Sequence, residues 1–391
     1  MDFTFMKIEF IDLPNSKSYF IRWLILNFIY NNKIIEIDST ESNDVKVVHR
    51  ALCTLQKHKK SNEYIHIPME DCGSGYRFIT TLAAAWPGKW HLTGTPRLLE
   101  RPITPLIQTL QQVGALIHTS TDGLWIQGKT LTPSEITIDC SISSQLASSI
   151  LLSAPLLHNP KIKICSNTNN SISYLQMTQN MILNKLWENN KIEKDWSAAL
   201  FWYAYVLLHS STTLHLNGLS PLDIQPDVKI FEWFKNWGIN SIFDPTGVLI
   251  YNPQKQEIPH QTINLQNNID AAPILSVLAL LYPFTLTLTG IEHLNFKESK
   301  RKEILLNTIS NFTIVEEHNN HSITIYKREK ELPQTLHLSS HNDHRFVMAW
   351  TLFHHFLEIN IDDKTCVLKS YPQFFEELKK MEKNFQRTSK N

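Results

Sequence analysis

Glycine is scarce in this chain, and neither sign of charge is in excess. Only 11 of the 391 residues are glycine, so several tight turns must form without the residue that adopts them most easily. The 37 basic side chains are matched by 37 acidic ones, which leaves a formal net charge of zero. This balance argues against binding to nucleic acid or to a membrane surface through bulk charge. Any anion-binding role must therefore come from where the cations lie.

Long apolar runs are also absent. The longest extends from Ala271 to Tyr282 and contains Pro273, whereas a transmembrane helix needs about 20 apolar residues. The first stretch, MDFTFMKIEFIDLP, alternates like a strand and lacks the apolar segment of a signal peptide. The five cysteines are scattered and odd in number, which indicates free thiols in a reducing compartment. We therefore expect a cytoplasmic protein.

What the sequence does contain is a repeated pattern of an alternating strand, a polar loop and an amphipathic helix. Six copies span residues 33–52, 89–115, 160–182, 213–239, 286–306 and 365–381. Six strongly apolar helices lie between them: IRWLILNFIY, YRFITTLAAAW, QLASSILLSAPLL, SAALFWYAYVLLH, AAPILSVLALLY and HRFVMAWTLFHHF. Single cores stop growing at about 250–300 residues. The simplest interpretation is two domains, each with three strand/helix units.

Basic residues gather at the starts of the predicted helices. In the copy at 286–306 a helix is predicted to begin near Lys297, with Lys300, Arg301 and Lys302 also in its first turns. Helix N-termini attract anions, so these four cations are explained if an external anion joins them. A single basic helix start is usually a solvated face, but further cations lie in similar places: Lys17, Arg22, Arg77, Arg101, Arg345 and Lys369.

Two carboxylates are candidates for proton transfer. Glu298 lies among the cations that begin at Lys297, which favours its ionised form. Asp270 precedes an apolar helix, where the simpler role is a helix N-cap. Acid–base chemistry requires both groups to face a common ligand. His341 and His344 have the spacing of metal ligands, but no further histidine or cysteine accompanies them, so no metal site is predicted.

Short sequences in a fixed order resemble those of the 5-enolpyruvylshikimate-3-phosphate synthase family, the 3-phosphoshikimate 1-carboxyvinyltransferases. LPNSKSYFIR is similar to the family's LPGSKSxxxR, and DCGSGYRF is similar to its NAGTAMRF. The others, in order, are TGTPRLLERPI, SSQ, EKDWSAA, DAAP, FKESKR, NDHR and KSYPQFF. Each match is weak alone, but the ordered set, from about residue 12 to residue 378, is specific.

The resemblance implies an α/β (α+β) fold of two domains, each made of three βαβαββ units, in the enolpyruvyl transferase-like inside-out α/β barrel. One domain is expected to be discontinuous, residues 1–14 plus 224–391. Residues 15–223 are expected to form an inserted domain, with the active site in the cleft between the two. The implied reaction transfers the enolpyruvyl group of phosphoenolpyruvate to the 5-hydroxyl of shikimate 3-phosphate and releases phosphate, as a step of aromatic amino acid biosynthesis. The protein is expected to be a monomer that needs no metal or organic cofactor and that binds neither nucleic acid nor a membrane.

The resemblance also implies roles for single residues. Asp270 matches the family's proton acceptor, Glu298 its proton donor, and Lys17 a lysine that contacts both substrates. Matches to the shikimate 3-phosphate site are Lys17, Ser18, Arg22, Ser143, Ser144, Gln145, Ser171, Tyr174, Asp270, His293 and Lys297. Matches to the phosphoenolpyruvate site are Lys17, Gly73, Arg101, Gln145, Arg301, Arg345 and Lys369.

The sequence departs from the family pattern at Asn15, Asp71, His293 and Lys300, which bears on affinity and loop geometry more than on reaction type. Two alternatives stay open. A non-catalytic relative that only binds ligand is one, because Asp71 and Lys300 alter charges near the anion sites. The other is UDP-N-acetylglucosamine enolpyruvyl transferase, which shares the fold and phosphoenolpyruvate. That family uses a cysteine in the loop matching residues 95–101, where this chain has none.

Overall fold

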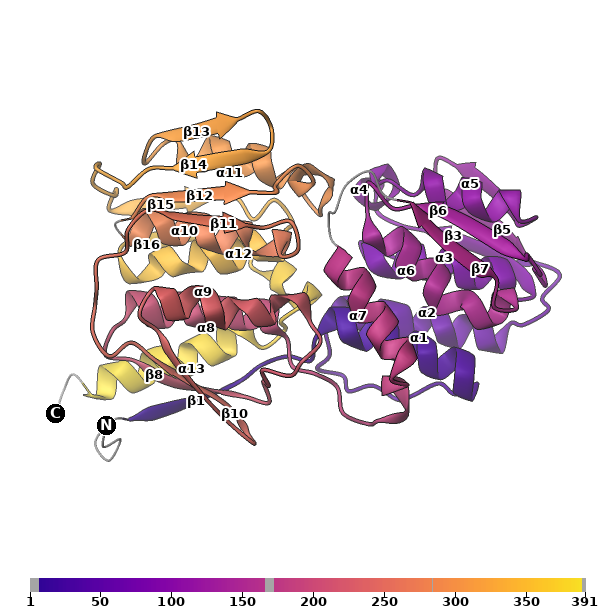
Figure 1. Ribbon diagram of the computed structural model, residues 1–391, viewed down its shortest axis with the longest axis horizontal. Coiled ribbons are helices and arrows are strands. Elements are labelled where there is room, and N and C mark those ends of the chain that lie inside the picture. The colour runs from indigo at the N-terminus through magenta and orange to yellow at the C-terminus, as the bar shows by residue number, and fades with distance from the viewer. Residues whose placement is uncertain (1–6, 166–171, 283, 389–391) are drawn as a thin grey trace. The chain divides into compact units, whose positions relative to one another are not determined.

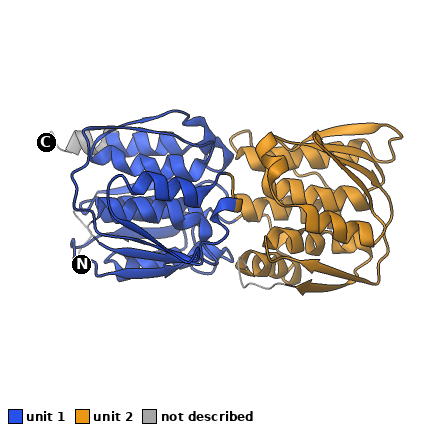
Figure 2. Ribbon diagram, turned by 90° about the horizontal axis from the view of Figure 1, so that it is seen from above, with its two compact units in different colours: residues 1–16, 193–295, 299–391 blue, residues 17–192, 296–298 orange. Residues whose placement is uncertain are grey.

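The computed structural model describes residues 7–165, 172–282 and 284–388, with side chains as far as residue 382. The chain forms two compact units (Figure 2). Unit 1 comprises residues 1–16, 193–295 and 299–391, and unit 2 comprises residues 17–192 and 296–298. Both are built from mixed sheets and helices, which confirms the predicted two-domain α/β class.

Unit 1 contains two four-stranded sheets of the same topology. Across the first sheet the strands are β1 (Ile8–Asp12), β8 (Thr213–Asn217), β10 (Gly247–Tyr251) and β9 (Asn240–Asp244). Across the second they are β11 (Gln261–Asn264), β12 (Leu286–Thr289), β14 (Ser322–Ile325) and β13 (Val315–His318). In each sheet the first pair is parallel and the other two pairs are antiparallel. A separate parallel pair, β15 (Thr335–Leu338) and β16 (Glu358–Ile361), follows the second sheet along the chain.

Unit 2 has one sheet of this kind and one parallel pair. The four strands are β2 (Tyr64–Pro68), β3 (Gly88–Thr93), β5 (Gly123–Gly128) and β4 (Leu116–Ser120). The pair is β6 (Glu135–Asp139) and β7 (Lys161–Cys165). Its α-helices are α1 (Lys17–Asn31), α2 (Asn43–Lys57), α3 (Gly73–Ala85), α4 (Pro96–Glu100), α5 (Thr104–Gln112), α6 (Ser144–Ser153) and α7 (Ile172–Leu183).

The βαβαββ unit is present in complete form twice in unit 1 and once in unit 2. A helix precedes the second strand of each parallel pair, and another helix precedes the antiparallel hairpin, as in β2–α3–β3–α5–β4–β5; between β1 and β8 the chain also forms residues 17–192 of unit 2. The pairs β6/β7 and β15/β16 carry only the first half of this pattern. Helices α1 and α2 have no strand of their own within the described residues.

The six apolar helices predicted from the sequence are confirmed. In unit 1 they are α8 (Trp196–Leu208), α10 (Ala272–Leu281) and α12 (His344–Thr351), and in unit 2 they are α1, α3 and α6. Every residue of α10 is buried, because a helix that is apolar on all sides must be surrounded by protein. Figure 1 shows α8, α10 and α12 between the sheet that contains β12 and the sheet that contains β8. Helices inside and sheets outside correspond to the inside-out arrangement.

Three local predictions are wrong. Residues 33–38 form no strand, because nothing in the described chain pairs with them. Residues Thr365–Lys369 form a 3-10 helix (η8), and the strand expected there lies earlier, at β16. Helix α11 (Arg301–Ile309) begins four residues later than expected, because the Asn295 side chain accepts from the Lys302 amide at 3.0 Å and so caps that turn.

The second boundary between the units differs from the expected division. Residues 193–223 pack with unit 1, whereas the expected division places them in the inserted domain. The reason is that β8 pairs with β1 and β10, so α8 and β8 complete a unit 1 sheet.

Unit 1 also contains α9 (Ile230–Asn236) and α13 (Phe374–Thr388). None of the helices in the described part of the chain combines the length and apolar character needed to cross a lipid bilayer.

Candidate active site

Two cations of unit 2 lie in the first turns of α1. Lys17 is the first residue of this helix, and its Nζ lies 3.0 Å from the Asp44 carboxylate. Arg22 is buried, and it donates from Nε to Thr178 Oγ1 at 2.7 Å and from Nη1 to the Ser18 carbonyl at 2.8 Å. Burial lowers the pKa of Arg22 to about 10, because these neutral partners do not balance its charge. Arg22 is therefore oriented by its hydrogen bonds but not neutralised by them.

Arg77, on α3, ties together several residues of unit 2. Its Nε and Nη2 donate to the Pro102 carbonyl at 3.2 and 2.8 Å. Its Nη1 donates to the Gly73 carbonyl at 3.0 Å and to Gln145 Oε1 at 2.8 Å. Burial, followed by the charge of Arg101, lowers the pKa of Arg77 to about 9. Arg77 was not among the residues predicted to bind a substrate, yet it positions two of the predicted phosphoenolpyruvate residues, Gly73 and Gln145.

Arg101 and Gly73 approach each other closely. A Cβ atom at Gly73 would lie 2.2 Å from Arg101 Nη1, so a larger residue there would displace this guanidinium from its present position. Arg101 is 7% exposed, and its Nε and Nη1 have no hydrogen-bond partner among the described residues. Buried donors without acceptors are costly. An anionic ligand would supply the missing acceptors.

The serine-rich start of α6 has the predicted geometry of a helix N-terminus. Ser143 is the N-cap, and its hydroxyl accepts from the Gln145 amide at 3.3 Å. Ser144 is buried, and Tyr174 lies half-buried on α7, which packs against α6. Gln145, at the start of α6, accepts a hydrogen bond from Arg77 on α3, which links this end of α6 to α3. Ser171 lies outside the described residues.

The predicted proton donor belongs to a three-residue segment, Phe296–Glu298, that packs with unit 2. Arg97, on α4, donates from Nη2 to the Lys297 carbonyl and from Nε to the Glu298 carbonyl, both at 3.1 Å. The Glu298 carboxylate partly offsets the lowering of the Arg77 pKa, so the two charges lie near each other. The charge of Glu298 therefore acts on Arg77, which in turn binds Gly73 and Gln145.

In unit 1, Arg301 is neutralised by two aspartates. Its Nε and Nη2 donate to the two oxygens of Asp343, at 2.7 and 3.1 Å, and its Nη1 donates to Asp270 Oδ1 at 2.6 Å. Arg301 and Asp343 are buried, and Asp343 also accepts from the Ser299 hydroxyl at 2.8 Å. Such two-oxygen pairing fixes both orientation and charge. The packing of α10 against α12 brings Asp270 and Asp343, which precede these helices, to the same place.

The predicted proton acceptor, Asp270, does not occupy the N-cap position of α10, because it lies inside the 3-10 turn η5 (Ile269–Ala271) and Ala271 is the N-cap residue. Its side chain is 21% exposed, and Oδ2 lies 4.0 Å from Arg345 Nη2. Burial alone would lower the pKa of Arg345, but the Asp270 and Asp195 carboxylates raise it above the ordinary value. Arg345 also donates from Nη1 to the Ser197 carbonyl at 3.3 Å. The two guanidiniums favour the charged form of Asp270, while its side chain stays partly exposed.

Two other cations of the segment 297–302 have acidic partners inside unit 1. Lys302 Nζ lies 2.6 Å from Glu317, and Lys300 Nζ lies 3.7 Å from Glu303. Because Arg301 is paired as well, an external anion is not required to explain Lys300, Arg301 and Lys302, and the predicted role of Arg301 in anion binding stays a prediction.

Two further site residues lie in unit 1. Lys369 ends η8 and is buried, and His293 is half-buried in the loop after β12. Asp71, one of the departures, accepts a hydrogen bond from the Thr95 hydroxyl at 3.3 Å. No group of three or more His, Cys, Asp or Glu side chains within the described residues has the arrangement of a metal site.

Sequence reasoning missed Asp44, Arg97 and Asp343. Asp343 lies directly before α12, and its carboxylate accepts from the Arg345 amide at 3.0 Å. Its position therefore signals an N-cap, which hides its pairing with Arg301. Arg97 and Asp44 carry no signal beyond their charge, since their partners are distant in sequence.

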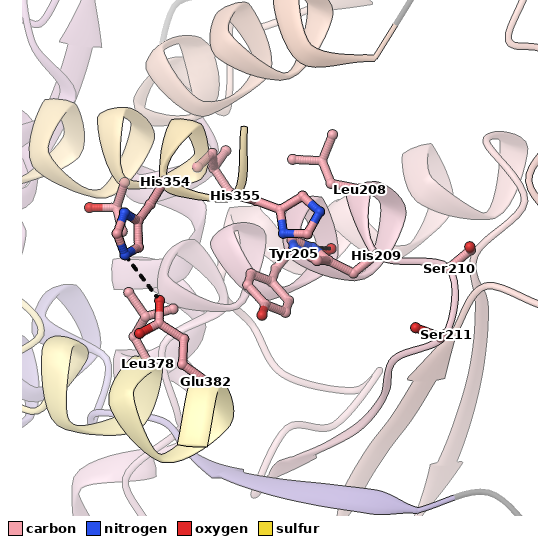
Figure 3. Close-up of a pocket in the computed structure, with 11 residues that line it drawn as sticks. Tyr205, Leu208, His209, Ser210, Ser211, His354, His355, Leu378 and Glu382 are labelled. Atoms are coloured by element: carbon pink, nitrogen blue, oxygen red, sulfur yellow. Dashed lines mark hydrogen bonds and ion pairs between the residues drawn. The ribbon is translucent and has the colours of Figure 1, made fainter. Parts of the chain in front are cut away.

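A separate cavity of about 590 Å³ in unit 1 contains none of the predicted site residues. Figure 3 shows His209, His354 and His355 around it, with His354 paired to Glu382 at 3.6 Å. The His209 ring stacks on Tyr205 at a centroid distance of 4.0 Å, and burial lowers the pKa of His209 to about 4. A smaller cavity, of about 370 Å³, lies between α9 and β11.

Comparison with known proteins gives a consistent result along the whole chain. A model of the family described as EPSP synthase (3-phosphoshikimate 1-carboxyvinyltransferase) matches residues 11–186 and 183–378. The 3-phosphoshikimate 1-carboxyvinyltransferase of Bacteroides fragilis is 28% identical, over 95% of this chain and 94% of that protein.

Solved structures share the fold. The EPSP synthase of Acinetobacter baumannii superimposes with a TM-score of 0.67 at 17% identity, and 96% of each chain is covered. The enolpyruvyl transferase NikO of Streptomyces tendae gives a TM-score of 0.62 at 10% identity, covering 96% of this chain and 94% of that one.

Proposed function

The chain belongs to the EPSP synthase (3-phosphoshikimate 1-carboxyvinyltransferase) family, and we propose that it catalyses the reaction for which the family is named. The enolpyruvyl group of phosphoenolpyruvate passes to the 5-hydroxyl of shikimate 3-phosphate, and phosphate is released. The observation that carries this proposal is a family match over both units, in a chain that has an acid, a base and the cations at the matching positions.

In the proposed reaction Asp270 accepts the proton of the attacking hydroxyl. Its support is the pairing with Arg301 and the approach of Arg345, which keep the carboxylate charged and partly exposed. Glu298 supplies the proton to the methylene carbon of phosphoenolpyruvate. Lys17 stabilises the charge that develops as the tetrahedral intermediate forms and expels phosphate.

The anions are proposed to bind at two sets of residues. Arg101, Gly73 and Gln145 of unit 2, with Arg301, Arg345 and Lys369 of unit 1, hold phosphoenolpyruvate. Shikimate 3-phosphate is held by Ser18, Arg22, Ser143, Ser144, Ser171, Tyr174, His293 and Lys297. The donors of Arg101 that lack acceptors support the first set most directly. The proposal includes a monomer in the cytoplasm, which gel filtration and cell fractionation test.

One assay tests the reaction: phosphate release from the purified protein with both substrates, compared with each substrate omitted in turn. Release only when both are present supports the proposal. Release with UDP-N-acetylglucosamine as acceptor, and none with shikimate 3-phosphate, would replace it by the related transferase. Calorimetric binding of both substrates without any release would make this chain a non-catalytic relative.

A further inference from the structure

Arg97 contacts the backbone that carries Glu298 through two nitrogens of its guanidinium group. Nε and Nη2 make this contact, with the carbonyls of Glu298 and Lys297, whereas Nη1 lies 3.3 Å from Glu100 on the next turn of the short helix α4, so that all three nitrogens have a partner. The side chain is 33% exposed, so it is not a core residue whose loss would disrupt folding. Thr95 holds the start of α4, since its hydroxyl accepts from the Leu98 amide at 3.2 Å.

The segment that Arg97 holds has no regular structure of its own. Residues 297–300 lie between a 3-10 turn that ends at Phe296 and the start of α11, and they belong to no helix or strand. Ser299, next in the chain, packs with unit 1 and donates to Asp343, whereas Phe296–Glu298 pack with unit 2. The Glu298 main chain is thus placed by a guanidinium that binds two successive carbonyls, a contact that fixes direction as well as position.

We propose that Arg97 is a positioning residue for Glu298: by binding the carbonyls of residues 297 and 298, it holds the Glu298 carboxyl group where proton transfer to the substrate takes place. The proposal rests on the proposed function, in which Glu298 is the proton donor. It differs from a role in anion binding, because the donors of Arg97 are directed at backbone carbonyls and at Glu100 rather than left without acceptors as in Arg101.

The two roles predict different kinetics. Loss of a positioning contact moves the proton donor without removing a substrate contact, so kcat should fall by about 10- to 100-fold while the KM for phosphoenolpyruvate stays within about twofold. Loss of an anion-binding contact would raise that KM instead. Lysine keeps the charge but cannot bind two carbonyls side by side, so Arg97→Lys should recover little of the activity lost in Arg97→Met.

The chain offers a matched control in unit 1. Arg328 is also half-exposed and also donates to two backbone carbonyls, those of Leu280, at 3.0 Å, and Lys330. Arg328→Met therefore removes the same kind of contact away from the proposed site, and kcat should be unchanged. A comparable fall in kcat for Arg328→Met would show that any lost guanidinium–carbonyl contact has this effect, and would overturn the proposal.

A double-mutant cycle and hydrogen exchange complete the test. If Arg97 acts through Glu298, adding Arg97→Met to Glu298→Gln should cause no further loss of kcat, whereas multiplied losses would overturn the proposal. Amide exchange of residues 294–303 should become faster in Arg97→Met and not in Arg328→Met, whether or not the enzyme turns over. Faster exchange in an inactive protein would keep the positioning contact and reject the proposed function. Unchanged exchange would reject the contact itself.

Discussion

The buried arginines of the two units are held in opposite ways. In unit 1, all three donor nitrogens of Arg301 bind the carboxylates of Asp343 and Asp270, and nearby carboxylates raise the pKa of Arg345. In unit 2, Arg77 binds carbonyls and an amide oxygen, and burial lowers its pKa. Carbonyls orient a guanidinium without cancelling its charge.

This difference separates two tasks that a neutral chain must perform. In unit 2, two donor nitrogens of Arg101 have no acceptor within the described residues, so this unit is suited to attract an anion. Unit 1 contains balanced ion pairs, one of which includes Asp270, the predicted proton acceptor. The distinction can be tested by removing the same kind of side chain from each unit and measuring stability and binding separately.

The largest effect is expected where charge balance is lost. Arg301→Met leaves Asp343 buried without its cation, so the free energy of unfolding should fall by about 3–5 kcal/mol in a urea titration. Adding Asp343→Asn should recover part of this loss, since the unpaired charge is then gone. Arg77→Met, which leaves carbonyls rather than a carboxylate without a partner, should cost about 1–3 kcal/mol. Equal losses for the two arginines would remove the comparison.

A smaller effect tests the donors of Arg101 that have no acceptor within the described residues of unit 2. In Gly73→Ala the new Cβ meets the Arg101 guanidinium, which must move away from its present position. Because charge-assisted hydrogen bonds contribute about 1.5–3 kcal/mol, phosphoenolpyruvate should bind roughly 10- to 100-fold more weakly in calorimetry. Gly114→Ala is the control for backbone strain alone, since its φ of +92° disfavours alanine while the new Cβ would meet nothing within 4 Å. Unchanged affinity in Gly73→Ala would mean that Arg101 does not contact this ligand.

Acid should act on unit 1 through a group outside the arginine pairs. His209 Nδ1 donates to the Tyr205 carbonyl at 2.7 Å, which raises the pKa of His209, but burial has the larger effect and lowers this pKa to about 4. The unfolded chain, with a histidine pKa near 6.5, then binds the proton more tightly. Stability that is fully present above about pH 6.5 is lost as the pH falls toward 4, by on the order of 1–2 kcal/mol.

The comparison variant for this acid effect is His209→Asn, which should lose less stability than the parent chain between pH 7 and pH 4.5 in urea titrations. His118→Asn, at an exposed position on β4 of unit 2, should follow the parent chain. If all three proteins lose the same free energy over this range, the acid sensitivity comes from groups other than His209.

Much of the fold could be predicted from sequence because its strongest signals are local. The apolar runs of α8 and α10 can only be central helices, and the order of short motifs indicated the family and its inside-out units. The predictions that failed concern single elements whose form depends on residues outside them. The start of α11 depends on Asn295, which caps the helix from outside, and residues 33–38 lack a partner strand, which no property of the segment itself reveals.

The site could be predicted as a set of residues but not as a set of charges. Motif matches name Asp270, Arg301 and Arg345, yet the state of each charge depends on partners tens of residues away, such as Asp343 for Arg301. The four cations at 297–302 looked alike in sequence. In the structure Arg301 is buried and paired with aspartates, while the Lys297 carbonyl binds Arg97. Only the packing of α10 against α12 separates these cases.

The smallest effect on stability, and the sharpest form of the comparison, is expected for Arg101→Met. The methionine fills a similar buried space, and the substitution removes donors that have no acceptor within the described residues. The free energy of unfolding should therefore change by less than about 1 kcal/mol, far less than for Arg301→Met. Phosphoenolpyruvate should raise the melting temperature of the parent chain, and it should raise that of Arg101→Met much less, because a ligand stabilises only the state it binds. A large loss of stability without ligand would show that Arg101 already has structural partners, and that unit 2 is balanced in the same way as unit 1.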